Sequence, residues 1–125
     1  MSLTILYAED NRLVSDAVRD LLEAEGWRVE FCSDGNAAMN RIAGGFPYDL
    51  LLLDNELPGA SGMELTRYAR NLPRYRTTPI VMLSATDCRS DARGAGADLF
   101  LRKPDDIHAL VGAVRRLTAS PHHRF

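Results

Sequence analysis

The sequence predicts an α/β domain in which five parallel strands form one sheet and a helix follows each strand. Short apolar runs alternate with amphipathic stretches five times along the 125 residues, and such alternation is typical of βα units. The apolar runs are continuous, as expected of strands that are buried on both faces of a parallel sheet. The crossovers between these strands should be right-handed.

The five expected strands coincide with the apolar runs, at residues 3–8, 28–32, 49–53, 80–83 and 98–101. The expected helices lie at residues 12–25, 36–43, 62–71, 87–95 and 106–118. The first and last helices are the clearest, because apolar residues recur there at helical spacing. We expect the fourth helix to be short, because residues 87–95 hold almost no large apolar side chain and are broken by Gly94 and Gly96.

Composition limits the classes of function. The length fits one domain, and a hydrophobic fraction of 46% with 26% charged residues is ordinary for a soluble globular protein. A net charge of −2 gives no general attraction to nucleic acid or to anionic membranes, and no apolar run approaches the roughly 20 residues of a membrane span. Cys32 and Cys88 show no metal-ligand spacing and indicate reduced thiols in a cytoplasmic protein. We expect a domain over residues 1–119 and a disordered tail over residues 120–125.

Polar residues follow four of the five expected strands. In a parallel sheet the carboxyl ends of the strands meet at one edge, where α/β domains place their sites. Carboxylates gathered there suit Mg²⁺, and a lysine offers a compact charge that can pair with a carboxylate or a phosphoryl oxygen. Taken singly, each residue could be a helix cap or a polar strand end, but the ordered set favours a functional site. Its members are Glu9, Asp10, Asp54, Glu56, Ser84 and the chain's only lysine, Lys103.

These residues carry a resemblance to the receiver domain of bacterial two-component response regulators. The resemblance covers about residues 3–119 and implies a flavodoxin-like, doubly wound (βα)5 fold. The ordered motifs are specific as a set, although each alone is weak. They are Glu9-Asp10, the D-x-x-[ML]-P-x-x-x-G pattern from Asp54 through Pro58 to Gly62, Ser84-Ala85, and the segment from Gly96 to Lys103-Pro104.

The resemblance implies a phosphorelay receiver whose nucleophile is Asp54. A sensor histidine kinase or a histidine phosphotransfer protein would donate the phosphoryl group, in a Mg²⁺-dependent reaction that makes the chain a phosphoacceptor and not a turnover enzyme. Asp10, Asp54 and the backbone carbonyl of Glu56 would bind the metal directly, and Glu9 would act through a metal-bound water.

The resemblance also implies a conformational switch. Lys103 would contact the phosphoryl oxygens, and the Ser84 hydroxyl would move to hydrogen-bond the phosphoryl group. Phe100 would rotate inward behind Ser84, and the bond before Pro104 would be cis, an isomer essentially restricted to X–Pro. The output stays open: the chain is either a stand-alone receiver or a receiver from a longer protein, acting on an unknown partner or output domain.

Two departures from the family pattern and three alternatives remain. Only nineteen positions separate Ser84 from Lys103, about one helical turn fewer than is usual in the family. The fourth helix lies in this interval and normally belongs to the face that contacts the output partner, so phosphorylation could be read out differently here. The Glu56 side chain could tune dephosphorylation or be a solvated loop residue. A phosphorylation-silent receiver-like scaffold stays possible. Toprim-type Mg²⁺-dependent phosphodiester enzymes and haloacid-dehalogenase phosphatases share part of the acidic pattern, but neither accounts for Lys103-Pro104.

Overall fold

The computed structural model describes residues 2–119 and contains one parallel five-stranded sheet in the order β2-β1-β3-β4-β5. The order reverses direction at β1, which is the mark of a doubly wound sheet. The predicted fold class is therefore confirmed. The strands are β1 (Thr4–Ala8), β2 (Arg28–Cys32), β3 (Leu50–Asp54), β4 (Ile80–Ser84) and β5 (Leu99–Arg102).

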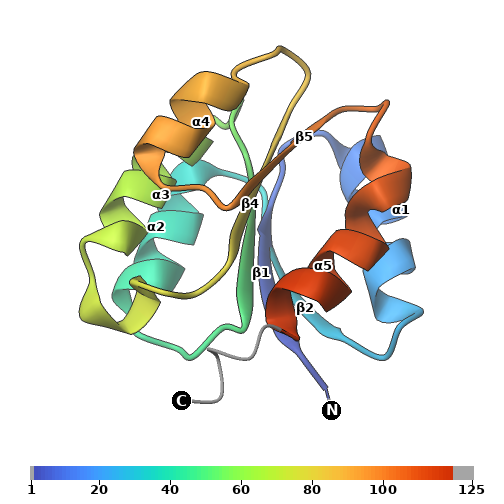
Figure 1. Ribbon diagram of the computed structural model, residues 1–125, viewed down its shortest axis with the longest axis horizontal. Helices are drawn as coiled ribbons and strands as arrows, with labels where there is room; N and C mark the ends of the chain where they lie inside the picture. The colour runs from blue at the N-terminus through green and yellow to red at the C-terminus, as the bar shows by residue number, and fades with distance from the viewer. Residues whose placement is uncertain (1, 120–125) are drawn as a thin grey trace.

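The helices cover both faces of this sheet (Figure 1). Helices α2, α3 and α4 lie on one side, and α1 and α5 lie on the other. Two 3-10 turns, η1 (Pro73–Tyr75) and η2 (Ile107–Ala109), complete the described elements. The helices are α1 (Arg12–Glu23), α2 (Gly35–Ala43), α3 (Gly62–Arg70), α4 (Arg89–Ala95) and α5 (Leu110–Thr118).

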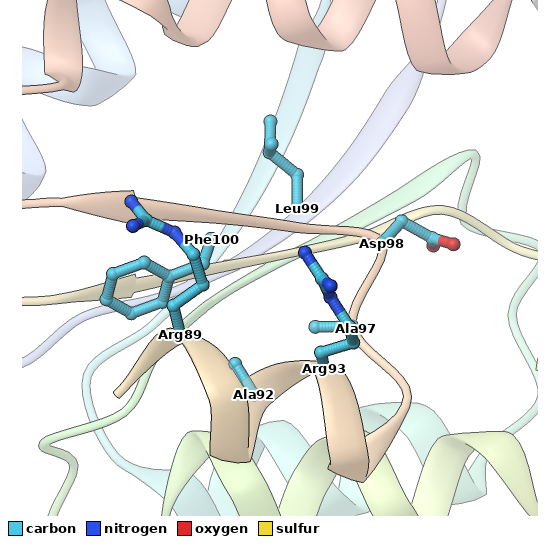
Figure 2. A pocket seen from close by; sticks show the side chains of 7 residues that line it. All are labelled: Arg89, Ala92, Arg93, Ala97, Asp98, Leu99 and Phe100. Carbon is cyan, nitrogen blue, oxygen red and sulfur yellow. The ribbon is translucent and has the colours of Figure 1, made fainter. Parts of the chain in front are cut away.

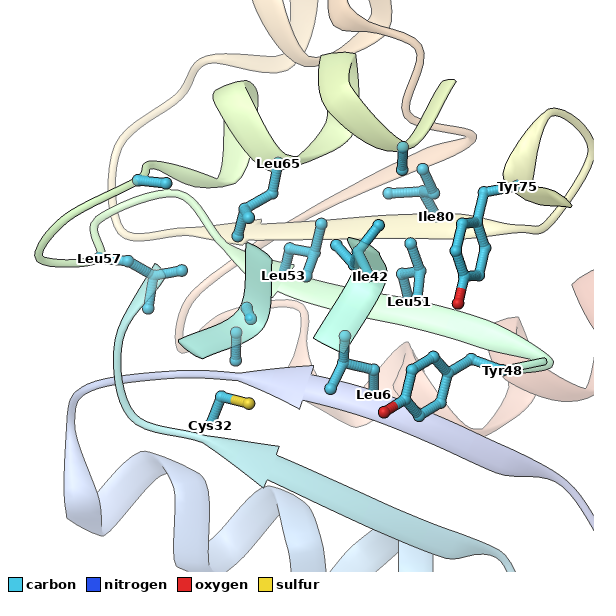
Figure 3. Close-up of a cluster of buried hydrophobic side chains, with 14 residues drawn as sticks. Leu6, Cys32, Ile42, Tyr48, Leu51, Leu53, Leu57, Leu65, Tyr75 and Ile80 are labelled. Carbon is cyan, nitrogen blue, oxygen red and sulfur yellow. The ribbon is translucent and has the colours of Figure 1, made fainter. Parts of the chain in front are cut away.

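The hydrophobic core has two layers because successive strand residues point to opposite faces. On β3, Leu51 and Leu53 pack toward α2 and α3, whereas Leu50 and Leu52 pack toward α1 and α5. Figure 3 shows the first layer, in which β3 side chains meet those of the helices above. Both faces are covered, which is why the strands read as continuous apolar runs.

Side-chain caps explain where three of the helices begin. Asn11 accepts a hydrogen bond from the backbone of α1, and Asp34 does the same for α2. Ser61 and Glu64 form a reciprocal capping box at the start of α3. Helix α4 has no side-chain cap hydrogen bond and spans seven residues, so the predicted shortening of the fourth helix is confirmed.

The element ends differ from the sequence prediction in a few places. Gly94 lies inside α4 and does not break it; the helix ends at Ala95 and is capped by Gly96, whose φ of 113° is left-handed. The last predicted helix begins as the 3-10 turn η2. Strands β3 and β4 continue one residue further, through Asp54 and Ser84. The predicted tail, residues 120–125, lies outside the described residues. Among residues 2–119, no helix is long and apolar enough to cross a membrane.

Candidate functional site

The polar residues predicted from the sequence come together at the carboxyl edge of the sheet. Asp54 is the last residue of β3 and Ser84 is the last residue of β4, and Glu9 and Lys103 directly follow β1 and β5. Glu9, Asp54 and Ser84 are all buried, at 0%, 1% and 0% exposure. A buried carboxylate requires a partner, because desolvation strongly disfavours an isolated charge.

Lys103 is that partner for both buried carboxylates. Its Nζ lies 3.0 Å from Oε1 and 3.1 Å from Oε2 of Glu9, and 3.1 Å from Oδ1 of Asp54. The backbone of Lys103 is held by a 2.8 Å hydrogen bond from its N–H to the Ser84 carbonyl. The Lys103–Pro104 bond is cis, as the resemblance implies. One ammonium group therefore serves two carboxylates from different strands.

The two buried carboxylates and the single ammonium group shift one another's pKa values. Burial, followed by the charge of Glu9, raises the pKa of Asp54 to about 7, although Lys103 pulls in the opposite direction. Burial alone would lower the pKa of Lys103, but the two carboxylates outweigh burial and raise it. Without a further cation the site carries more negative charge than Lys103 neutralises.

The donor set fits a divalent cation. Ligand oxygens of Glu9, Asp10 and Asp54 all lie within 4.8 Å of one another, and Asp10 is exposed, so the cluster is reachable from solvent. Oδ2 of Asp54 is buried and makes no hydrogen bond among the described residues, so the cluster contains a carboxylate oxygen without a partner. Clustered carboxylate oxygens are the ligands that Mg²⁺ and Ca²⁺ prefer.

The Glu56 side chain is not part of this carboxylate cluster. Ser84 Oγ donates to Oε2 of Glu56 at 2.5 Å, and the Ala85 N–H donates to Oε1 at 3.1 Å. The Glu56 N–H faces Oδ1 of Asp54 at 3.4 Å. Glu56 is an exposed loop residue, as one of the two alternatives held, but its carboxylate is not merely solvated, because Ser84 and Ala85 donate hydrogen bonds to it. A role in dephosphorylation stays a prediction.

Pro58 and Gly62 shape the loop that follows Asp54. The Pro58 carbonyl accepts a 2.9 Å hydrogen bond from the backbone N–H of Gly35. A Cβ added to Gly62 would lie 2.6 Å from the Asp54 carbonyl oxygen, closer than any real Cβ contact. The start of α3 can approach the end of β3 this closely only because residue 62 is glycine.

Phe100 is a residue of β5, and its side chain packs against α4. The residue is 6% exposed and packs against Met82 and Ala92, and the Arg89 guanidinium lies 5.3 Å from the ring centroid. Figure 2 shows these two side chains beside a small pocket of about 90 Å³ between α4 and β5. Phe100 is thus largely buried, and Arg89, which the sequence did not single out, contacts it. The rotation behind Ser84 that the resemblance implies stays a prediction.

Comparison with known proteins identifies the family. The model described as "Response regulator receiver domain" matches residues 5–115. The chain belongs to this family. It therefore acts as a receiver in phosphorelay signalling, and the choice left open between a receiver and an enzyme of the Toprim or haloacid-dehalogenase type is answered in favour of the receiver.

Individual relatives of the chain are response regulators and transcriptional regulators. The chain is 40% identical over 119 residues to the response regulator protein PmrA of Pseudomonas aeruginosa, covering 93% of this chain and 52% of that protein. It is 39% identical over 116 residues to the phosphate regulon transcriptional regulatory protein PhoB of Rhizobium meliloti, covering 90% and 51%. The receiver thus spans about half the length of the curated relatives it matches.

Solved structures agree as well. A putative response regulator from Chloroflexus aurantiacus superposes with a TM-score of 0.88 at 29% identity, covering 96% of this chain and 100% of that one. The receiver domain of a sensor histidine kinase from Pseudomonas aeruginosa, solved with a magnesium ion coordinated in its active-site cleft, superposes with a TM-score of 0.86 at 29% identity, covering 96% and 100%.

Proposed function

We propose that this receiver accepts a phosphoryl group on Asp54 from a sensor histidine kinase or a histidine phosphotransfer protein. The observation that carries the proposal is the unequal environment of the two Asp54 oxygens. Oδ1 is held by Lys103, whereas Oδ2 is buried with no hydrogen bond among residues 2–119. A carboxylate held on one side and free on the other is oriented for one new bond.

The chemistry is a displacement at phosphorus. A carboxylate oxygen of Asp54 forms a bond to the phosphorus atom while the bond from phosphorus to the donor's imidazole nitrogen breaks. The electron pair of the broken bond stays on that nitrogen, and the product is an acyl phosphate on Asp54. The domain is consumed as the acceptor, so it does not act as a turnover enzyme. Positioning and electrostatic stabilisation supply most of the catalysis of phosphoryl transfer.

Lys103 and Ser84 would stabilise the transferred group. The Lys103 ammonium already lies 3.1 Å from Asp54, so it can follow the charge that develops on the phosphoryl oxygens. Ser84 ends the strand next to β3 and offers a buried hydroxyl. Phe100, held under α4, would transmit the change to the output face.

Asp10 and Asp54 would hold Mg²⁺ directly, with the Glu56 backbone carbonyl as a further ligand, and Glu9, whose two oxygens accept from Lys103, would act through a metal-bound water. When bound, the ion supplies positive charge that neutralises the phosphoryl oxygens and lowers the pKa of Asp54. The three carboxylates orient that charge toward the acceptor oxygen.

The partner that donates the phosphoryl group would dock beside Lys103. An apolar groove of about 370 Å³ runs between α1 and the start of the β5–α5 connection, and it reaches the site through Lys103. Leu13 lines this groove and is 84% exposed. We place the histidine-bearing donor here, because the groove continues into the site where its phosphoryl group must arrive. The other lining residues are Val14, Ala17, Val18, Pro104 and Ile107.

The receiver would pass its signal to a partner protein or to an attached output domain. A cytoplasmic location without direct nucleic-acid or membrane contact stays a prediction.

The test is the intact mass of the protein after incubation with acetyl phosphate or phosphoramidate, with and without Mg²⁺. We expect a Mg²⁺-dependent gain of one phosphoryl group that is lost in Asp54→Asn and reduced in Lys103→Arg. Asp20→Asn, which removes an exposed carboxylate of α1, is the matched control and should react like the unaltered protein. A parallel measurement of Mg²⁺ binding separates the alternative: if no protein gains mass and the unaltered protein binds no Mg²⁺, the domain is a phosphorylation-silent scaffold.

A further inference from the structure

The side chain of Glu56 is bound by the hydrogen-bond donors at the end of β4. Each of its carboxylate oxygens has its own donor: the Ser84 hydroxyl at 2.5 Å and the Ala85 N–H at 3.1 Å. The Ser84 hydroxyl oxygen in turn accepts from the Thr86 N–H at 3.1 Å. The hydrogen bonds from Ser84 and Ala85 to the Glu56 carboxylate are together called the Glu56 contact.

The Glu56 contact lies next to Asp54. The Glu56 N–H is 3.4 Å from Oδ1 of Asp54, and β4 pairs directly with β3, so that Leu83 lies opposite Asp54 and Ser84 comes next. The backbone N–H of Glu56 thus faces Asp54. The Glu56 side chain accepts hydrogen bonds from Ser84, the last residue of β4, and from Ala85, which follows it. Glu56 itself is exposed, so its carboxylate can leave this position without disturbing the core.

We infer that the Glu56 carboxylate competes with the phosphoryl group for the Ser84 hydroxyl and the Ala85 N–H, and that it holds the receiver in its unphosphorylated form. The inference rests on the proposed function, in which Asp54 is the acceptor and Ser84 binds the phosphoryl group. A carboxylate and a phosphoryl group are both anions with several acceptor oxygens, so each can take the same two donors.

Both anions cannot occupy these donors together. The Ser84 hydroxyl has one proton to donate, and so has the Ala85 N–H. Like charges at close range also repel each other. Phosphorylation of Asp54 therefore requires the Glu56 carboxylate to release the donors, and loss of the phosphoryl group lets it return. Glu56 should slow the gain of the phosphoryl group and shorten its lifetime.

The decisive variants change the carboxylate and keep the backbone. Glu56→Gln retains the shape but can accept with one oxygen only, and Glu56→Ala removes the contact entirely. With acetyl phosphate and Mg²⁺ followed by intact mass, we expect both to be phosphorylated faster, by about tenfold for Glu56→Ala, which corresponds to about 1.4 kcal/mol. Glu23→Gln, which removes an exposed carboxylate of α1, should match the unaltered protein.

A second measurement needs no phosphorylation. In the unphosphorylated protein, the Ala85 amide proton should resonate downfield because it is bonded to a carboxylate. That resonance should move upfield in Glu56→Ala and stay in place in Glu23→Gln. Thermal unfolding of each variant checks that the fold is intact.

The outcomes distinguish the competition by Glu56 from the proposed acceptor role of Asp54. If Asp54→Asn abolishes phosphorylation but the Glu56 variants react at the unaltered rate or more slowly, the competition is refuted and the acceptor role of Asp54 stands. If the Ala85 resonance does not move, the Glu56 contact is absent in solution and the inference is overturned. If no protein is phosphorylated, the proposed function fails and the inference fails with it.

Discussion

Burial of the Asp54 carboxylate should make the metal-free receiver less stable as the pH rises from about 4 to about 7. The pKa of Asp54 is raised from an ordinary 3.8 to about 7, by burial and then by the charge of Glu9. Each pKa unit corresponds to about 1.4 kcal/mol, so charged Asp54 costs the folded state up to about 4 kcal/mol.

The direction follows from proton binding. Between these two pKa values the folded protein keeps the Asp54 proton and the unfolded chain has lost it. Stability falls with pH wherever the folded state binds more protons. The contribution of Asp54 is therefore fully present below pH about 4, declines toward pH about 7, and stays constant above that.

Asp54→Asn removes this decline, because the amide resembles the protonated acid and does not ionise. We expect the variant and the unaltered protein to be about equally stable at pH about 4, and the variant to be more stable by up to about 4 kcal/mol at pH about 8. Urea denaturation in EDTA across this range measures the difference. Added Mg²⁺ should shrink it, because a ligand of the folded state alone stabilises that state.

Other carboxylates also titrate in this range, so the difference between proteins is the informative quantity. Asp20→Asn, at an exposed position on α1, supplies the control and should parallel the unaltered protein at every pH. Parallel curves for Asp54→Asn as well would refute the reasoning, because they would mean that Asp54 ionises alike in the folded and unfolded states.

Three further changes test the framework around the site, each by urea denaturation. Gly62→Ala should destabilise the fold by about 1–3 kcal/mol and slow phosphorylation, because the new Cβ meets the Asp54 carbonyl; an unchanged midpoint would contradict that close approach. Arg70→Met should cost about 1–3 kcal/mol, because the guanidinium binds three backbone carbonyls and Asp98, and full stability would show that water replaces it. Ser61→Ala should cost about 1 kcal/mol by breaking the capping box of α3, and a loss below a few tenths would mean that the cap does not form in solution.

The sheet was predictable because burial on both faces leaves a direct trace in the sequence. The run Leu50–Asp54 holds four consecutive leucines, all fully buried, and no amphipathic helix would tolerate that pattern at a surface. The strand ends were less predictable: Asp54 and Ser84 are polar, yet both still belong to their strands. Pairing with a neighbouring strand, which no local pattern encodes, keeps them in the sheet.

The positions of Glu9, Asp54, Ser84 and Lys103 were predictable from topology alone, because every parallel strand delivers its next residue to the same edge. The Glu56 contact was not. Ser84 lies 28 residues away in the sequence, and the conformation of the intervening loop decides whether the Glu56 side chain turns toward β4 or toward solvent. Arg89 was missed for the same reason, since its stacking on Phe100 depends on how the short α4 sits over β5.

The single lysine of an arginine-rich chain has a geometric explanation in this site. Lys103 Nζ lies at 3.0 Å from Glu9 and 3.1 Å from Asp54, two carboxylates that are themselves almost fully buried. An ammonium is compact and can donate in three directions from one atom, whereas a guanidinium is a wide planar fork suited to one carboxylate at a time. Between β1 and β3 the charge must be shared by two carboxylates and still reach an incoming phosphoryl group. The residue type therefore follows from the number of anions that one cation must serve.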